Sequence, residues 1–182
     1  ENIAYGKPDA TLAEMRDACR RAQALDFIEA LPEGFATVLG ERGSSLSGGE
    51  LQLVVIARAL AQGAPIVVMD EPTSHLDFRN DLVVLELIVR LIKEKGLTIV
   101  IATHFPNHAF YFENNGLPVT AGLMAGGKVA AVGPPSQVLT EDNMRRIFQI
   151  ESKLISFEIP SDGICRQLIP LRISPQDAGN PW

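Results

Sequence analysis

Three stretches of the chain carry residue types and spacings that can do chemistry. A Ser-Gly-Gly run at 47–49 directly precedes an apolar, helix-like segment, so its hydroxyl and backbone amides can bind an anion with help from the helix dipole. Asp70 and Glu71 follow four apolar residues, and His104 closely follows a second apolar run. One carboxylate of such a pair can serve Mg²⁺ while the next orients or deprotonates a water beside a phosphate, to which the imidazole can donate.

Each of these features also has a simpler structural explanation. A glycine pair before a helix can be a plain tight turn, and an Asp-Glu pair after a strand more often begins a helix than binds a metal. A lone histidine is more often a surface or core residue, which is the interpretation we give to His75 and His108 taken singly. In an open α/β sheet, however, ligands bind beyond the carboxyl ends of the strands, where the carboxylate pair and His104 both fall.

The spacing of the apolar residues predicts an alternation of helices and strands. Thr11 and Glu14 form a capping-box pattern at the start of a helix expected to run to about residue 30. Two short apolar strands at 66–69 and 97–102 flank an amphipathic helix at 81–94, which is a strand–helix–strand unit of a parallel sheet. The other predicted elements are a helix from the glycines to about 62, a strand-like connector at 35–43, two strands around Gly126-Gly127 within 117–132, a helix at 140–148, and a hairpin pairing 153–159 with 164–171.

Bulk composition narrows the class of protein. The chain has 182 residues, of which 46% are hydrophobic, and this suits one ordinary domain with a real core. The net charge of −6 argues against a nucleic-acid partner, and no run of 18 apolar residues is available to span a membrane. Cys19 and Cys165 are far apart and lack a CxxC spacing, so we expect buried, reduced thiols.

Four motifs, taken together, resemble one known family in their order and spacing. LSGGE at 46–50, IVVMDE at 66–71, SHLD at 74–77 and the Thr103-His104 pair look like the signature, Walker B strand, D-loop and H-loop of an ABC transporter ATPase domain. The resemblance implies an α/β chain with part of the P-loop NTPase (ABC ATPase) fold: an α-helical subdomain, a mostly parallel core sheet and a C-terminal β-hairpin. The expected divisions are a helical subdomain at 1–50, core at 51–150, a hairpin at 151–173 and a disordered tail at 174–182.

The resemblance also implies a role for each motif. Two such domains form a head-to-tail dimer, and the signature of one contacts ATP held mainly by the phosphate loop of the other. The residues that would make these contacts with ATP are Ser47, Gly48, Gly49 and Glu50. Asp70 would hold Mg²⁺ through water, Glu71 would be the general base, and His104 would steady the γ-phosphate. Ser74, His75 and Asp77 would communicate across the dimer.

The phosphate-binding loop GxxxxGK[ST] is absent from the sequence. Its two Gly-Lys pairs, at 6–7 and 127–128, are followed by Pro8 and Val129 rather than by Ser or Thr. We therefore expect a chain that starts between the Q-loop and the signature of its family. Such a chain lacks most of the phosphate affinity, so we expect it not to hydrolyse ATP by itself.

The resemblance changes along the chain. Residues 1–49 are similar to exporter ATPases, whereas residues 50–172, about two thirds of the sequence, are similar to importers of iron chelates or cobalamin. A natural hybrid, a recombined gene and an assembly artefact all fit this change. We favour an ATP-hydrolysing importer subunit of iron-siderophore or haem type, bound to a transmembrane permease at the cytoplasmic face of the membrane. An exporter ATPase and a non-catalytic module that donates its signature to an intact partner are the alternatives.

Phe105 stands where the family often has Asp, so it can perturb His104.

Overall fold

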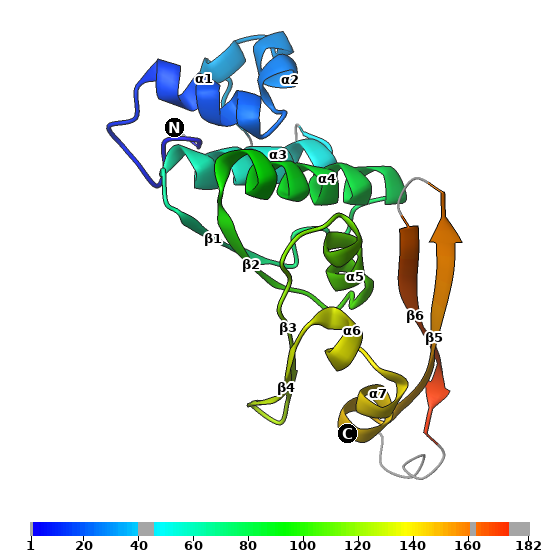
Figure 1. Ribbon diagram of the computed structural model, residues 1–182. Coiled ribbons are helices and arrows are strands. Elements are labelled where there is room, and N and C mark those ends of the chain that lie inside the picture. The colour runs from blue at the N-terminus through cyan, green and yellow to red at the C-terminus, as the bar shows by residue number, and fades with distance from the viewer. Residues whose placement is uncertain (1, 40–45, 161–162, 175–182) are drawn as a thin grey trace. The chain divides into compact units, whose positions relative to one another are not determined.

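The computed structural model describes residues 2–39, 46–160 and 163–174. The chain forms two compact units, residues 1–103 and residues 104–182 (Figure 1). The first unit contains α1 (Leu12–Arg21), α2 (Leu25–Ala30), the 3₁₀ turn η1 (Gly34–Ala36), α3 (Gly48–Ala61), β1 (Ile66–Asp70), α4 (Phe78–Lys95) and β2 (Thr98–Ala102). The second contains α5 (Asn107–Asn114), β3 (Ala121–Ala125), β4 (Lys128–Gly133), α6 (Pro135–Val138), α7 (Glu141–Phe148), β5 (Ile150–Ile159) and β6 (Gly163–Ile173). The predicted α/β class is confirmed, whereas the finer division at residues 50, 150 and 173 stays a prediction.

The helix predicted over about 11–30 is instead two helices, α1 and α2. Gln23 adopts a left-handed φ of 58°, and the amide of Ala24 donates to the carbonyl of Cys19 at 2.8 Å, which closes the end of α1. The predicted start is confirmed, because Thr11 and Glu14 form a reciprocal capping box. The prediction of one continuous helix was wrong because the helical spacing of the apolar residues continues on both sides of a break of only three residues.

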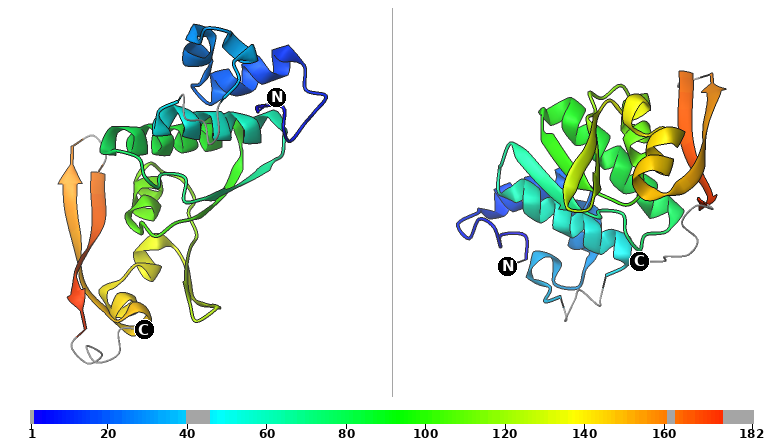
Figure 2. Two further views of the ribbon diagram at one scale, coloured as in Figure 1. Left: turned by 180° about the vertical axis from the view of Figure 1, so that it is seen from behind. Right: turned by 90° about the horizontal axis from the view of Figure 1, so that it is seen from below.

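Three helices of the first unit are tied together at their ends. α1 packs on α3, and α3 and α4 lie side by side in all views (Figures 1 and 2). Arg21 donates to the carbonyl of Leu60 at 3.1 Å, and Arg90 donates to the carbonyl of Arg21 at the same distance. Cys19 is fully buried and free, and burial raises the pKa of its thiol to about 11, so it stays protonated at neutral pH.

The predicted strand–helix–strand unit is present as β1–α4–β2. β1 and β2 pair in parallel with Ile66 opposite Thr98 and Asp70 opposite Ala102. Within β1 the exposure alternates, so Val67 and Met69 are buried while Val68 is 73% exposed. The described residues form three separate two-stranded sheets, of which β1–β2 is parallel and β3–β4 and β5–β6 are antiparallel.

The described residues of the second unit form two hairpins and three helices around a shared core. β3 and β4 pair around Gly126-Gly127, and β5 pairs with β6, as the sequence predicts. The turn before Gly163 lies outside the described residues, as do residues 40–43 of the predicted connector and most of the predicted tail. The side-chain amide of Asn107 on α5 donates to the carbonyl of Leu168 at 3.1 Å and accepts from the amide of Leu168 at 2.8 Å. This pair of hydrogen bonds holds α5 against β6. The buried core consists of Phe110, Leu123, Val138, Leu139, Met144 and Leu168.

None of the helices in the described ranges is long and apolar enough to cross a membrane.

Candidate functional site

The Ser-Gly-Gly stretch forms the start of α3. Ser47 is the N-cap, and its hydroxyl accepts from the amide of Glu50 at 3.3 Å. Glu50 reaches back, so that its carboxylate accepts from the Ser47 amide at 2.8 Å and from the Ser47 hydroxyl at 2.7 Å. The backbone and hydroxyl donors of Ser47 hold the pKa of Glu50 below its usual value. The predicted anion-binding hydroxyl is therefore engaged by a carboxylate of the same chain.

The two glycines of this stretch differ in their surroundings. Gly48 is exposed, and a Cβ added there would lie 3.6 Å from a methyl of Leu76, an ordinary contact. Gly49 is buried, and a Cβ added there would lie only 2.8 Å from the side-chain amide of Asn80. The start of α3 therefore packs directly against the first turn of α4 and the residues just before it.

Asp70 and Glu71 lie at the carboxyl end of β1. Asp70 is exposed and is the last residue of the strand, paired with Ala102 of β2. The amide of Glu71 donates to the carbonyl of Ala102 at 2.9 Å, which fixes the backbone just beyond the sheet. The placement of the carboxylate pair at a strand end, expected from the sequence, is confirmed.

The segment between β1 and α4 is held in two tight turns. Glu71 and His75 adopt φ values of 45° and 66°, a left-handed region that costs non-glycine residues of order 1–3 kcal/mol. The amide of Ser74 donates to the Glu71 carbonyl, and Asp77 caps α4 by accepting from the amide of Asn80 at 2.8 Å. Such strain is concentrated at functional sites in proteins, and no pattern in the sequence revealed it.

His104 begins the second unit and stacks with its neighbour. The rings of His104 and Phe105 have centroids 4.0 Å apart at 38°, and Phe105 lies 5.2 Å from the ring of His108 on α5. His108 is buried within α5, which makes it a core residue, one of the two alternatives that the sequence left open. The Phe105 ring therefore contacts both imidazole rings, and its influence on His104 stays a prediction.

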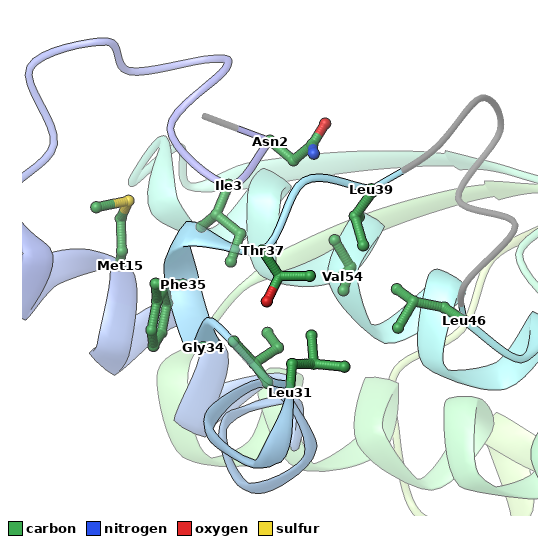
Figure 3. Close-up of a pocket in the computed structure, with 11 residues that line it drawn as sticks. Asn2, Ile3, Met15, Leu31, Gly34, Phe35, Thr37, Leu39, Leu46 and Val54 are labelled. Atoms are coloured by element: carbon green, nitrogen blue, oxygen red, sulfur yellow. The ribbon is translucent and has the colours of Figure 1, made fainter.

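A cavity of about 80 Å³ lies in the first unit, and among the motif residues only Leu46, the first residue of LSGGE, is part of its described lining (Figure 3). Its walls are largely apolar, with Ile3, Phe35 and Leu39 among them. The buried hydroxyl of Thr37 lies among these side chains and has no hydrogen-bond partner among the described residues. Ligand pockets for drug-sized molecules measure roughly 300–1,000 Å³. This cavity is too small and too apolar for a nucleoside triphosphate.

One residue that belongs with the site was missed by the sequence analysis. Asn80 contacts Gly49 and also donates to Asp77, so it joins two predicted motifs. The Asp-x-x-Asn spacing at a helix start was the available signal, because an N-cap side chain commonly accepts from the third helical residue.

Comparison with known proteins agrees with this geometry. The family profile "ABC transporter" matches residues 6–74, which include the 46–50 and 66–71 motifs. The ATP-dependent lipid A-core flippase of Chromobacterium violaceum is 48% identical over 101 residues, covering 56% of this chain and 17% of the flippase. The chain thus spans less than a fifth of that relative.

Two solved structures share the fold over most of the chain. One is an inward-facing metal-chelate type ABC transporter, with a TM-score of 0.66 and 29% identity over 84% of this chain and 56% of the other. The second is a bacterial Atm1-family ABC exporter with ATP bound, with a TM-score of 0.60 and 37% identity over 78% of this chain and 23% of the other. The likeness to an exporter therefore extends well beyond residues 1–49.

The motifs, the fold and these matches define a nucleotide-binding protein of the ABC class. The chain carries part of the ATPase domain of an ABC transporter.

Proposed function

We propose that this chain contributes the signature side of an ATP site shared with a second ABC ATPase domain. In this arrangement Ser47, Gly48, Gly49 and Glu50 contact ATP that the partner holds in its phosphate loop. The observation that supports it most is the start of α3, where Ser47 and Gly48 are exposed. ATP binding requires the Ser47 hydroxyl to exchange the Glu50 carboxylate for a phosphate oxygen.

The strand-end residues provide the hydrolytic side of a second site. Asp70 is an exposed carboxylate at the end of β1, a donor that suits Mg²⁺ because this ion keeps waters and takes one or two carboxylates. A Mg²⁺ ion bound by Asp70 would neutralise charge on the phosphate oxygens. Glu71 accepts a proton from the attacking water, with its backbone held by Ala102. The role of His104 beside the γ-phosphate rests on its place in the sequence after β2.

The transporter around this ATPase supplies the remaining parts. ATP closes the head-to-tail dimer, and residues Ser74, His75 and Asp77 relay that closure between the two domains. A transmembrane permease converts the motion into transport, so the chain lies on the cytoplasmic face of a membrane. Nucleic acid is not among the partners.

The direction of transport has two candidates. Import of an iron chelate follows from the sequence motifs after residue 50, and the likeness to a metal-chelate type transporter supports it. Export is favoured by the flippase and by the Atm1-family exporter, whose fold matches across most of the chain. The coding sequence upstream decides between them, because a membrane-spanning segment on the same polypeptide would favour the exporter.

Titration of Mg-ATP into the purified chain tests the shared site. We expect no saturable heat with the chain alone, and no ATP turnover. One-site binding by the wild type that Asp70→Asn abolishes would show that the chain holds ATP without a partner, and would refute the proposal.

A stimulation assay tests signature donation directly. The chain is added to the isolated ATPase domain of the C. violaceum flippase, and the rate of ATP hydrolysis is measured. We expect the rate to rise several-fold with the wild-type chain and not with Ser47→Arg. Ser156→Arg, an exposed site on β5 in the other unit, is the matched control and should stimulate like the wild type. Equal stimulation by Ser47→Arg would refute the role of the signature.

A further inference from the structure

The glycine at 49 is required by space rather than by backbone conformation. A Cβ there would approach Asn80 Cγ and Oδ1 to 2.8 Å and Nδ2 to 3.1 Å, distances that real Cβ atoms essentially never show or tolerate only if the neighbour moves. Gly49 lies within the regular first turn of α3, without the positive φ found at other glycines of the chain. The backbone of α3 therefore rests directly on the amide face of Asn80.

Asn80 is itself held in place from one side. Asp77 accepts from the backbone amide of Asn80 through Oδ1 at 2.8 Å and from its side-chain Nδ2 through Oδ2 at 3.0 Å. Both carboxylate oxygens thus bind the same residue, and this fixes the orientation of the side-chain amide. Asn80 is partly buried, and α3 and α4 pack together at this point.

We propose that Asn80 is a positioning residue, which sets the place of the first turn of α3 relative to the 74–77 segment. Displacement of Asp77 shifts Asn80, and Asn80 cannot shift toward Gly49 without moving the start of α3. This proposal rests on the proposed function, since it links the residues that relay dimer closure to the residues that contact ATP.

A double-mutant cycle in thermal unfolding tests the contact. Replacing a helical glycine by alanine is ordinarily stabilising, so Gly49→Ala should raise the melting temperature unless the added Cβ collides with Asn80. We expect Gly49→Ala to lower it in the wild-type background and to raise it in an Asn80→Ala background. If Gly49→Ala fails to fold, recovery of folding in the double variant is the equivalent result.

Gly48→Ala is the matched control, because its Cβ would meet only Leu76 at 3.6 Å. We expect its effect on the melting temperature to be the same with or without Asn80→Ala. The proposal is overturned if the Gly49→Ala effect is also the same in both backgrounds, or if the double variant remains unfolded.

The stimulation assay separates positioning from mere packing. We expect the maximal ATPase rate of the flippase domain to be several-fold lower with the folded Asn80→Ala chain than with the wild-type chain. The concentration of chain that gives half of the maximal stimulation should be unchanged. An unchanged maximal rate would reduce Asn80 to a packing residue and overturn the positioning role. Lack of stimulation by the wild-type chain would overturn the proposed function and this functional link, while the melting cycle would still decide the contact.

Discussion

Replacing Ser47 by alanine should destabilise the start of α3 by an amount that the capping box sets. The substitution removes two of the three bonds of the box, those made by the hydroxyl, and leaves the bond from the Ser47 amide to Glu50. Loss of a serine N-cap costs about 0.5–2 kcal/mol, typically near 1. For a cooperative unit of about 100 residues, 1 kcal/mol lowers the melting temperature by roughly 4–8 °C.

Thermal unfolding measures the loss of stability in the Ser47→Ala variant, and amide hydrogen exchange measures the local opening of α3. We expect a lower melting temperature, together with faster exchange in the first turns of α3. Thr11→Ala is the matched comparison in the same unit, because Thr11 and Glu14 make the corresponding three bonds at 2.7, 2.9 and 3.2 Å. Thr140→Ala, which uncaps α7 in the other unit, should leave exchange in α3 unchanged.

The reasoning fails if Ser47→Ala melts like the wild type while Thr11→Ala melts several degrees lower. That pattern would mean that the capping box does not hold the start of α3, and that Ser47 and Glu50 pair without contributing to stability.

Three further predictions follow from other parts of the chain. The pKa of Glu50 is lower in the folded state than in the unfolded state. The Glu50 carboxylate therefore contributes fully to stability when the pH is above the unfolded-state pKa of about 4.3, and this contribution is lost as the pH falls through the folded-state pKa. Denaturant titrations should therefore show a smaller loss of stability between pH 7 and pH 3 in Glu50→Gln than in the wild type, and equal losses would contradict this. Phe105→Leu should remove ring-current shifts from the imidazole protons of His104 and His108 in proton NMR spectra, and unchanged shifts would show that the rings do not stack. Val68 and Val100 are 73% and 52% exposed on β1 and β2, so we expect the chain to self-associate through this apolar face, and Val68→Thr with Val100→Thr should reduce that association in sedimentation experiments. The same replacement at Val129, 59% exposed on β4, is the control, and an equal reduction there would refute a specific role for the β1–β2 face.

Local patterns in the sequence predicted most of the secondary structure. Apolar runs of four to six residues marked β1 and β2, and the periodicity between them marked α4, because these signals depend only on neighbours along the chain. The Thr11 capping box and the Gly126-Gly127 turn are equally local and were also predicted. The break at Gln23 was missed because a left-handed glutamine has no distinctive local signal.

The motif spacing by itself determined the family and placed the chemically competent residues at a helix start and at strand ends. Their individual roles stay predictions, as does the direction of transport. Tertiary structure alone decided which of these residues touch. The Gly49–Asn80 contact joins positions on different helices, and the left-handed turns at Glu71 and His75 lie where the chain leaves β1 to enter α4. Close packing of α3 on α4 creates the contact, and no pattern along the sequence encodes a distance between side chains that meet only after folding.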